Sequence, residues 1–339
     1  VLGIAYKNTE NIGDNVENDL IFTGLVGIID PPKENVDKSI AACKKAGIKV
    51  RMITGDHLKT AASIAREIGI LTDGKVIDGE TLDKLSDEEY FEMVDDIQVY
   101  ARVKPEQKMR IVETLKQKGE IVSMTGDGVN DAPALKNASI GVAMGSGTDV
   151  AKESGDMIIQ DDNFETIVTA IREGRKIYDN IKRFVKFQVS TNVGAILTIV
   201  GTSIFMLPVP FNPVQLLWIN IVMDGPPAQT LGMEGSERNI MTRQPETGDI
   251  LNKKVLIKIF IAGLVMAIGS IALFSYKLAI GASQKQAMTV AFTLFVMYQL
   301  FNAYNSKSNS AKKSTYLYLA IIACFILQVL IVYIPELQI

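Results

Sequence analysis

Long apolar runs in the second half of the chain limit its fold more than any other sequence feature. Each is close to the ~20 residues that a helix needs to cross a bilayer. The runs cover Phe187–Met206, Pro213–Met233, Val255–Tyr276, Ala287–Tyr304 and Tyr316–Ile334. We therefore predict a membrane domain over residues 187–339, an all-α bundle of five transmembrane helices with the lipid bilayer as its partner.

Lysine and arginine distinguish the two sides of this bundle. They cluster before the first run, between the second and third, and between the fourth and fifth, whereas the third-to-fourth connection has only Lys277 and Lys285. By the positive-inside rule, the basic loops and residues 1–186 are cytosolic. The formal net charge of -3 gives no sign of a nucleic-acid partner. Cys43 and Cys324 lie in different halves, so we expect no disulfide between them.

The first half of the chain alternates between strand and helix patterns. The expected strands are Ile21–Asp30, Ile48–Ile53, Ile97–Ala101, Ile121–Met124, Ile140–Met144 and Met157–Gln160, and the expected helices are Lys33–Ala46, His57–Ile68 and Pro105–Lys118. This rhythm is typical of an α/β fold with a parallel sheet covered by helices on both faces. The acidic stretch Asp83–Asp96 is predicted to be an exposed helical insertion without a catalytic role. A helix from about Glu165 is predicted to run into the first apolar run, so that residues 163–186 form a stalk.

The string TGDGVNDAPALK, residues 125–136, brings Asp127, Asn130 and Asp131 together directly after an expected strand. Open α/β sheets bind ligands at the carboxyl ends of their strands. Two carboxylates this close repel each other unless a cation lies between them, and Mg²⁺ takes one or two carboxylates together with phosphate oxygens. We therefore predict that Asp127 holds Mg²⁺. For an isolated Gly-Asp-Gly, an Asx-rich turn before a helix would be the simpler interpretation.

Two other strand ends carry groups that suit a phosphate. Thr54, in the sequence Thr54-Gly55-Asp56, offers a hydroxyl and nearby backbone N–H groups at the start of a helix. Lys108 lies early in its helix and can act as a point charge for phosphate at the edge of the sheet. Taken alone, Thr54 is more simply a helix N-cap and Lys108 a solvated helix lysine.

The second apolar run contains oxygen groups that suit a cation. Asn220 and Asp224 are four residues apart, which places them on one face of an α-helix. A carboxylate inside the bilayer indicates a functional site, although a proline kink with Asp224 in an internal hydrogen bond would also place one there. Asn192 in the first run can add another amide oxygen, or it can form an interhelical hydrogen bond.

The two prolines after Asp224 free further oxygens for the same site. Pro226 and Pro227 have no N–H, so the carbonyls of Val222 and Met223 lose their helical partners. Free carbonyls, an amide and a carboxylate form the kind of oxygen-rich site that Ca²⁺ prefers. Broken helices at mid-membrane depth are typical of transport sites.

Together these motifs resemble the type II, Ca²⁺-transporting P-type ATPases. The resemblance covers essentially the whole chain and rests on DPPK, TGD, ARVKPEQK, TGDGVNDAPALK and the intramembrane Asn-x-x-x-Asp. DGPPAQ, residues 224–229, is most similar to the secretory-pathway Ca²⁺/Mn²⁺ branch and its bacterial relatives. The resemblance implies a haloacid-dehalogenase-like sheet with catalytic Thr54, Gly55, Asp56, Lys108, Asp127, Asn130 and Asp131. It also implies that Asp30, Arg102 and Lys108 contact ATP.

Some parts of such a pump are not found in these 339 residues. The nucleophilic Asp of Asp-Lys-Thr-Gly-Thr and the Thr-Gly-Glu-Ser loop are both absent. The resemblance therefore implies the C-terminal half of a pump, whose partner is the missing N-terminal half. Residues 1–20 would end the nucleotide-binding insertion, and residues 21–162 would form a phosphorylation domain without its first strand. We expect no ATP hydrolysis by this chain alone, and its short loops fit a multi-pass protein of a bacterial plasma membrane.

The resemblance also implies which ion is carried and how many. Relatives that bind two Ca²⁺ have Glu, Thr and Glu where this chain has Ala195, Met223 and Gln299. The expected activity is therefore ATP-driven export of one Ca²⁺ per cycle from the cytosol through an aspartyl-phosphate, with Mg²⁺ as cofactor. Alternatives are a pump for Mn²⁺ or another cation, a membrane-anchored phosphatase of the haloacid dehalogenase type, and a non-catalytic channel or scaffold.

Overall fold

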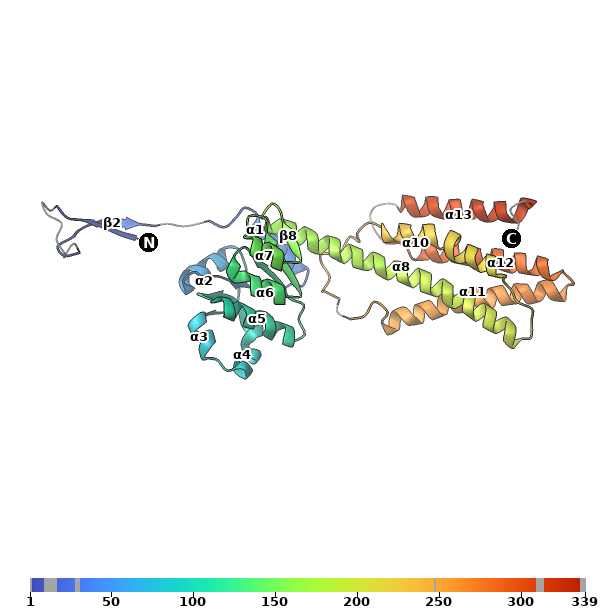
Figure 1. Ribbon diagram of the computed structural model, residues 1–339, viewed down its shortest axis with the longest axis horizontal. Helices are drawn as coiled ribbons and strands as arrows, with labels where there is room; N and C mark the ends of the chain where they lie inside the picture. Colours follow the sequence, from blue (N-terminus) through green and yellow to red (C-terminus); the bar gives the residue numbers. More distant parts are fainter. Residues whose placement is uncertain (1, 9–16, 28–30, 247, 309–313, 336–339) are drawn as a thin grey trace. The chain divides into compact units, whose positions relative to one another are not determined.

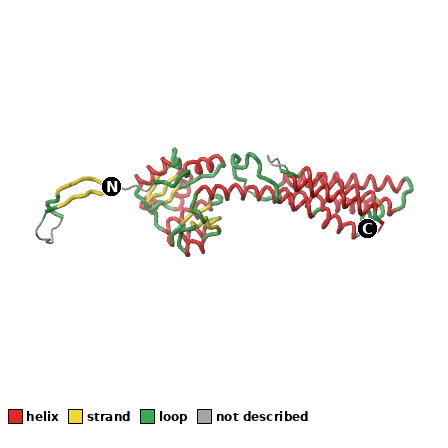
Figure 2. Tube along the Cα trace, turned by 90° about the horizontal axis from the view of Figure 1, so that it is seen from above, coloured by secondary structure: helices red, strands yellow, loops and turns green. Residues whose placement is uncertain are grey.

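The computed structural model describes residues 2–8, 17–27, 31–246, 248–308 and 314–335. The chain divides into two compact units, drawn in Figures 1 and 2. The first comprises Val1–Ala41 and Val50–Glu165, and it contains all the strands of the described residues. The second comprises Ala42–Lys49 and Thr166–Ile339, and its regular elements within the described residues are all helices. The predicted order, α/β followed by all-α, is confirmed.

The first two strands form a separate ribbon instead of joining a parallel sheet. β1 (Leu2–Tyr6) and β2 (Ile21–Val26) pair antiparallel, with Leu2 opposite Val26. The prediction that the strand at residue 21 belongs to the parallel sheet is therefore wrong for residues 21–26. Strands that follow each other along the chain can pair antiparallel through a simple reversal, whereas a parallel pair needs a long crossover. Residues 28–30, which include Asp30, lie outside the described part.

The remaining strands are all parallel, as predicted, but they form two sheets of three strands instead of one. The first sheet has the order β3-β5-β4 and the second the order β6-β7-β8. The strands are β3 (Met52–Ile53), β4 (Lys75–Asp78), β5 (Ile97–Ala101), β6 (Ser123–Gly126), β7 (Ile140–Met144) and β8 (Met157–Ile159). β3 is shorter than predicted, and β4 was not predicted because its apolar run is only two residues long. Among the strands of the described residues, β3 and β6 each have a paired neighbour on one side only.

Helices cover both faces of the first sheet, as expected for parallel strands. The helices of this unit are α1 (Val36–Lys45), α2 (Leu58–Glu67), α3 (Gly79–Lys84), α4 (Asp87–Met93), α5 (Pro105–Gln117), α6 (Ala132–Asn137) and α7 (Asp149–Ser154). Val99 and Ala101 of β5 pack with Ala61 of α2. Tyr100 points the other way and packs with Ile111 of α5. Alternate β5 side chains therefore enter two separate apolar cores.

The acidic stretch is helical, as predicted, but the prediction that it is exposed is wrong for its inner face. α3, α4 and the short helix η1 (Val94–Asp96) bury Leu82, Tyr90 and Val94 completely. The acidic side chains lie on the outside because the apolar positions recur at helical spacing and turn toward the core. The Tyr90 hydroxyl is 3.0 Å from that of Tyr100 on β5, and burial raises the pKa of Tyr90.

Within the described residues, the second unit has four helices long and apolar enough to cross a membrane. They are α8 (Phe164–Ile204), α11 (Lys253–Ala279), α12 (Gln284–Asn305) and α13 (Thr315–Tyr333). α8 is continuous, which confirms the predicted helix from residue 165 into the first apolar run. α8 and α11 approach closely at Gly194 and Gly263, since a Cβ added to Gly263 would lie 3.0 Å from the Gly194 nitrogen. Small residues commonly permit such contacts between membrane helices.

The second predicted span is helical but broken into three pieces. α9 (Pro213–Leu217) leads into the π-helical segment η3 (Trp218–Met223), and α10 (Gly225–Gly232) follows. In η3 the Asp224 N–H donates to the Ile219 carbonyl five residues earlier at 2.9 Å, instead of four. Pro226 and Pro227 cannot donate to carbonyls of the preceding turn, so α10 starts a new hydrogen-bonded ladder there. π-helical turns are often found at functional sites.

Candidate functional site

The loop after β6 is organised by Asp131. One oxygen of its buried carboxylate accepts a hydrogen bond from Lys108 Nζ of α5 at 2.6 Å. The other oxygen accepts from the backbone N–H groups of Asp127 and Gly128, each at 3.2 Å. The side chains of Lys108 and Asp131 are 17% and 10% exposed, so this ion pair is largely shielded from water. Asp131 thus orients the lysine and shapes the turn at the same time.

Asp127 has the opposite character. Its backbone carbonyl accepts from the Thr148 N–H at 2.8 Å, which fixes the main chain. Its exposed carboxylate has no hydrogen-bond partner among the described residues, and the same holds for the exposed side chain of Asn130. The sequence alone does not distinguish the roles of Asp127 and Asp131. In the structure, Asp131 is engaged by hydrogen bonds, and of the two carboxylates only that of Asp127 is open to a ligand.

This arrangement suits a magnesium ion that is shared with a phosphate. No group of three or more His, Cys, Asp or Glu side chains in the described ranges could hold a metal by itself. Mg²⁺ commonly takes one or two carboxylates and fills its other positions with water and phosphate oxygens. A single free carboxylate beside Lys108 fits that pattern, and Asp127 is the residue that would hold the ion.

Glycines let the loop pack this tightly. A Cβ added to Gly126 would lie 2.4 Å from the Cβ of Asp131, and one added to Gly147 would lie 2.8 Å from the Asp127 carbonyl oxygen. Both distances are far below contact distance, so neither position has room for a side chain. By contrast, a Cβ added to Gly128 would have its nearest neighbour at 3.6 Å.

Thr54, Gly55 and Asp56 form a turn at the carboxyl end of β3. The Thr54 hydroxyl donates to the Asp56 carboxylate at 2.9 Å and accepts from the Asp56 N–H at 3.1 Å. The N-cap of α2 is His57, whose side chain accepts from the Lys59 N–H at 3.3 Å. Thr54 is therefore not the cap of this helix, and its hydroxyl stands in an exposed turn.

The strands that carry these two turns share one packing partner. Ile53, directly before Thr54, and Val122, directly before β6, both pack against the clusters that contain Ile111 and Met124. Residues of α5 therefore belong to the same apolar clusters that Ile53 and Val122 border. Lys108 contacts Asp131 directly, and Asp127 and Asp131 lie in the same loop. Thr54 lies at the carboxyl end of the edge strand β3.

Of the residues predicted to contact ATP, Arg102 lies beside the Thr54 turn. Its backbone N–H donates to the Asp56 carbonyl at 3.1 Å, and its φ of 49° is left-handed. Its side chain is exposed and has no hydrogen bond within the described residues. Asp30 lies outside the described residues.

In the helical unit, Asp224 is buried and only partly satisfied. One of its carboxylate oxygens accepts a hydrogen bond from the Gln299 amide of α12, which also donates to the Ile219 carbonyl at 3.3 Å. The other Asp224 oxygen and the Gln299 amide oxygen are buried without a partner. Unpaired buried oxygens are costly, so the two point to a ligand that donates a proton or carries positive charge.

The other predicted cation ligands are not gathered around this carboxylate. Asn192 and Asn220 are exposed in this chain, and neither forms a hydrogen bond among the described residues. The Val222 carbonyl has a weak donor, the Cys324 thiol at 3.7 Å. The Met223 carbonyl has no helical donor, because proline occupies position 227 and the next N–H, that of residue 228, bonds to the Asp224 carbonyl at 3.0 Å.

Sequence reasoning missed Gln299 as the partner of Asp224. Gln299 was considered only as a position without charge, although an amide in the middle of the apolar run 287–304 was a usable signal.

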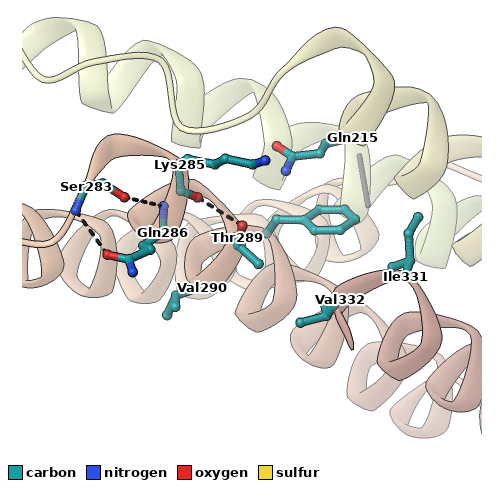
Figure 3. Close-up of a pocket in the computed structure, with 9 residues that line it drawn as sticks. Gln215, Ser283, Lys285, Gln286, Thr289, Val290, Ile331 and Val332 are labelled. Carbon is teal, nitrogen blue, oxygen red and sulfur yellow. Dashed lines mark hydrogen bonds between the residues drawn. The ribbon is translucent and has the colours of Figure 1, made fainter. Parts of the chain in front are cut away.

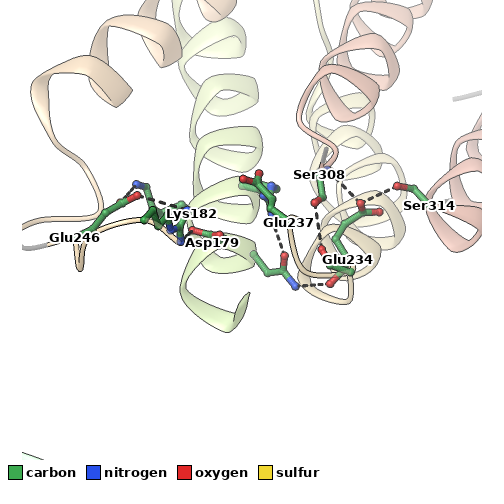
Figure 4. Close-up of polar contacts among 11 residues, drawn as sticks. Asp179, Lys182, Glu234, Glu237, Glu246, Ser308 and Ser314 are labelled. Carbon is green, nitrogen blue, oxygen red and sulfur yellow. Dashed lines mark hydrogen bonds and ion pairs between the residues drawn. The ribbon is translucent and has the colours of Figure 1, made fainter. Parts of the chain in front are cut away.

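A buried polar junction after α10, shown in Figure 4, was also not predicted. There Asn180 of α8 donates to the carbonyls of Gly232 and Glu234 at 3.1 and 3.0 Å. The Glu234 carboxylate accepts from the Ser314 hydroxyl at 2.7 Å.

Comparison with known proteins agrees with both parts of the site. Residues 6–139 match the family described as haloacid dehalogenase-like hydrolase, and residues 208–339 match the family described as cation transporting ATPase, C-terminus. A calcium-transporting ATPase of Bacillus subtilis is 41% identical over 96% of this chain and 38% of its own length. Human calcium-transporting ATPase type 2C member 1 is 40% identical over 94% of this chain and 36% of its own length.

A third relative, calcium-transporting ATPase 1 of Saccharomyces cerevisiae, is 43% identical over 88% of this chain and 32% of its own length. The chain thus spans less than two fifths of the length of these relatives. Its two family matches follow each other in the order of the two structural units. The chain therefore belongs to the cation-transporting P-type ATPases.

Proposed function

We propose that this chain is the C-terminal part of an ATP-driven pump that exports Ca²⁺ from the cytosol, one ion per cycle, through an aspartyl-phosphate. One observation carries the proposal. The same chain holds an open Asp127 beside the Lys108–Asp131 pair and, in its membrane helices, a buried Asp224 with an unsatisfied oxygen. A phosphatase or a scaffold would need no such carboxylate in the membrane. The relatives are named calcium-transporting ATPases, which supports Ca²⁺ as the cargo.

In the phosphorylation site, Lys108 provides positive charge for the transferred phosphoryl group, and Asp131 keeps the lysine in place. The Thr54 hydroxyl and the Gly55 backbone bind another phosphate oxygen, and Asn130 and Asp56 line the same edge. Arg102 and Asp30 contribute to ATP binding. Asp127 would hold Mg²⁺, and the bound ion would supply the charge neutralisation that phosphoryl transfer requires.

The nucleophilic Asp comes from a segment outside these 339 residues. β3 and β6 support this, because among the described strands each has a neighbour on one side only, and Ile53 and Val122 border the same apolar clusters as residues of α5. A parallel strand inserted between them would join the two sheets into one. Its carboxyl end would then lie beside Thr54 and Asp127, where an attacking carboxylate is needed. The chain by itself is accordingly inactive as an ATPase.

The transported ion binds at Asp224, with Asn220, Asn192 and the freed carbonyls of Val222 and Met223 as further ligands. The two asparagines are exposed in this chain, so they join the site when the rest of the pump packs against it. Gln299 directs its amide nitrogen at Asp224, and Ala195 and Met223 are buried without a charged oxygen. These positions provide no second anionic site, which supports one ion per cycle. Mn²⁺ also prefers oxygen ligands and is the alternative cargo.

The protein is a multi-pass membrane protein, in accord with its four spanning helices. We place the α/β unit in the cytosol, because lysine and arginine cluster in the connections on its side of the membrane. A bacterial plasma membrane is the proposed location.

Asp224→Asn in the complete pump tests the proposal. The variant should lose Ca²⁺-dependent phosphorylation from ATP, because the neutral amide no longer compensates the charge of the ion. It should keep phosphorylation from inorganic phosphate, which needs only the proposed phosphate site of the α/β unit. Asn302→Ala is the matched control. Asn302 of α12 is buried like Asp224, but it donates a hydrogen bond to Ser190 at 2.8 Å and forms none with Asp224.

Two results would contradict the assignment. Retained Ca²⁺ dependence in Asp224→Asn would remove this carboxylate from the cation site. Two occluded Ca²⁺ per phosphoenzyme in isotope binding, or a Hill coefficient well above one, would reject the one-ion stoichiometry.

A further inference from the structure

A cavity of about 490 Å³ lies at one end of the helical unit, where α9, α12 and α13 meet (Figure 3). It is lined by Gln215 at the start of α9, by the first turns of α12, and by Ile331 and Val332 at the end of α13. The connections that lead into α9 and α12 lack the basic clusters. In the proposed orientation the cavity therefore opens on the non-cytosolic side of the membrane.

The outer part of this cavity presents hydrogen-bond donors. Lys285 and Gln215 point toward each other across it (Figure 3). Gln215 is 2% exposed, and its amide oxygen accepts from the Asn212 N–H at 3.1 Å, whereas its amide nitrogen has no partner among the described residues. Lys285 forms no ion pair within those residues. None of the lining side chains is acidic, so the outer part of the cavity is suited to an anion.

The inner part of the cavity is apolar. Along α12 the lining changes from Ser283 and Lys285 to Val290 and Phe292, and Ile331 of α13 faces the same space. From Ser283 to Phe292 the helix rises about 13 Å, so the cavity passes from the membrane surface into the hydrocarbon region. A small soluble anion would use only the outer part of such a cavity. A molecule with a charged head and an apolar tail would use all of it.

We propose that this cavity binds a phospholipid of the non-cytosolic leaflet, with its phosphate at Lys285 and Gln215 and the start of an acyl chain along Val290 and Phe292. A lysine ammonium binds phosphate as a point charge, and the free Gln215 amide adds a second donor. The volume is within the range of small-molecule sites, about 300–1,000 Å³. The inference rests on the proposed membrane orientation, but it does not depend on the cation site.

Lipid retention by the complete pump tests the proposal. The pump is purified in detergent and supplied with phosphatidylglycerol. The retained lipid molecules are then counted by native mass spectrometry in the absence of ATP and Ca²⁺. Lys285→Ala should weaken retention of one lipid about fivefold, as expected for one lysine near an anionic headgroup. Gln215→Leu should weaken it as well. Lys277→Ala is the matched control, because Lys277 is the other cation of the same connection and does not line the cavity.

The source of the phosphate is tested by adding glycerol phosphate or inorganic phosphate to the same sample. The proposal requires that neither displaces the lipid at concentrations where phosphatidylglycerol saturates. Equal retention in Lys285→Ala and Lys277→Ala would overturn the site. If free phosphate displaced the retained lipid as effectively as added lipid does, a phospholipid could not be the specific occupant of the cavity. Because no transport is measured, failure of the cation-site proposal would leave these results unchanged.

Discussion

Gly126 at the end of β6 and Gly128 in the loop after it allow a sharp test of the proposed phosphorylation site. Gly126→Ala would place a Cβ 2.4 Å from the Cβ and 2.7 Å from the Cγ of Asp131. Ordinary carbon contacts begin near 3.4 Å, so Asp131 must move by about 1 Å. That shift would break its bond to Lys108, now 2.6 Å, and its two bonds to backbone N–H groups, now 3.2 Å.

The energetic cost follows from these contacts. The two backbone hydrogen bonds are worth about 1 kcal/mol each, and overpacking adds about 1–3 kcal/mol. We therefore expect Gly126→Ala to destabilise the α/β unit by about 3–5 kcal/mol. Because a displacement of about 1 Å in a catalytic group costs about 100-fold in rate, phosphoenzyme formation should fall at least that far.

Gly128→Ala, two residues further along the chain, is the matched control. Its added Cβ would have no neighbour closer than 3.6 Å, and its φ of -104° suits any residue. We expect a change in stability within about 0.5 kcal/mol and nearly normal phosphorylation. Both variants are made in the complete pump and compared by phosphoenzyme formation from ATP and by thermal unfolding. If the two variants phosphorylate within threefold of each other, the role of Asp131 in shaping the site is refuted.

Three further predictions concern other contacts. Lys108→Ala should slow phosphoryl transfer about 100-fold while leaving ATP affinity largely intact, and a single-turnover assay showing the reverse pattern would contradict its role. Gly47→Ala should lower the free energy of unfolding by at least about 1–2 kcal/mol, because its φ is +73° and the added Cβ would lie 2.0 Å from the Gln244 amide oxygen; an unchanged melting temperature would contradict this packing. The hydrogen bond from Lys182, at 2.6 Å, holds the pKa of Glu246 below its usual range. The pair therefore contributes its full stabilisation at pH values above the ordinary glutamate pKa of about 4.5. This stabilisation is lost as the pH falls through the lowered pKa of Glu246. Glu246→Gln should therefore flatten the acid side of a curve of unfolding free energy against pH.

Much of the fold could be predicted because it depends on local pattern. Apolar runs of membrane-spanning length specify helices wherever they lie, and four of them are long single helices. The strands that carry Thr54 and Asp127 could be placed because turn residues follow short apolar stretches. The membership of each sheet could not be predicted, since β-strand pairing depends on contacts between distant residues. For this reason the antiparallel pairing of β2 with β1, in place of a parallel sheet, was not predicted.

The sequence by itself determined which residue types are available for chemistry: acids and a lysine at strand ends, and a carboxylate next to two prolines in an apolar run. Only the tertiary structure decided how they divide their tasks. Asp131 is taken up by Lys108 and the loop N–H groups, which leaves Asp127 open. Asp224 is met by Gln299, 75 residues away, while Asn220 in the same run is exposed. Hydrogen-bond partners and burial are set by which elements pack together, and residue spacing along one element does not contain that information.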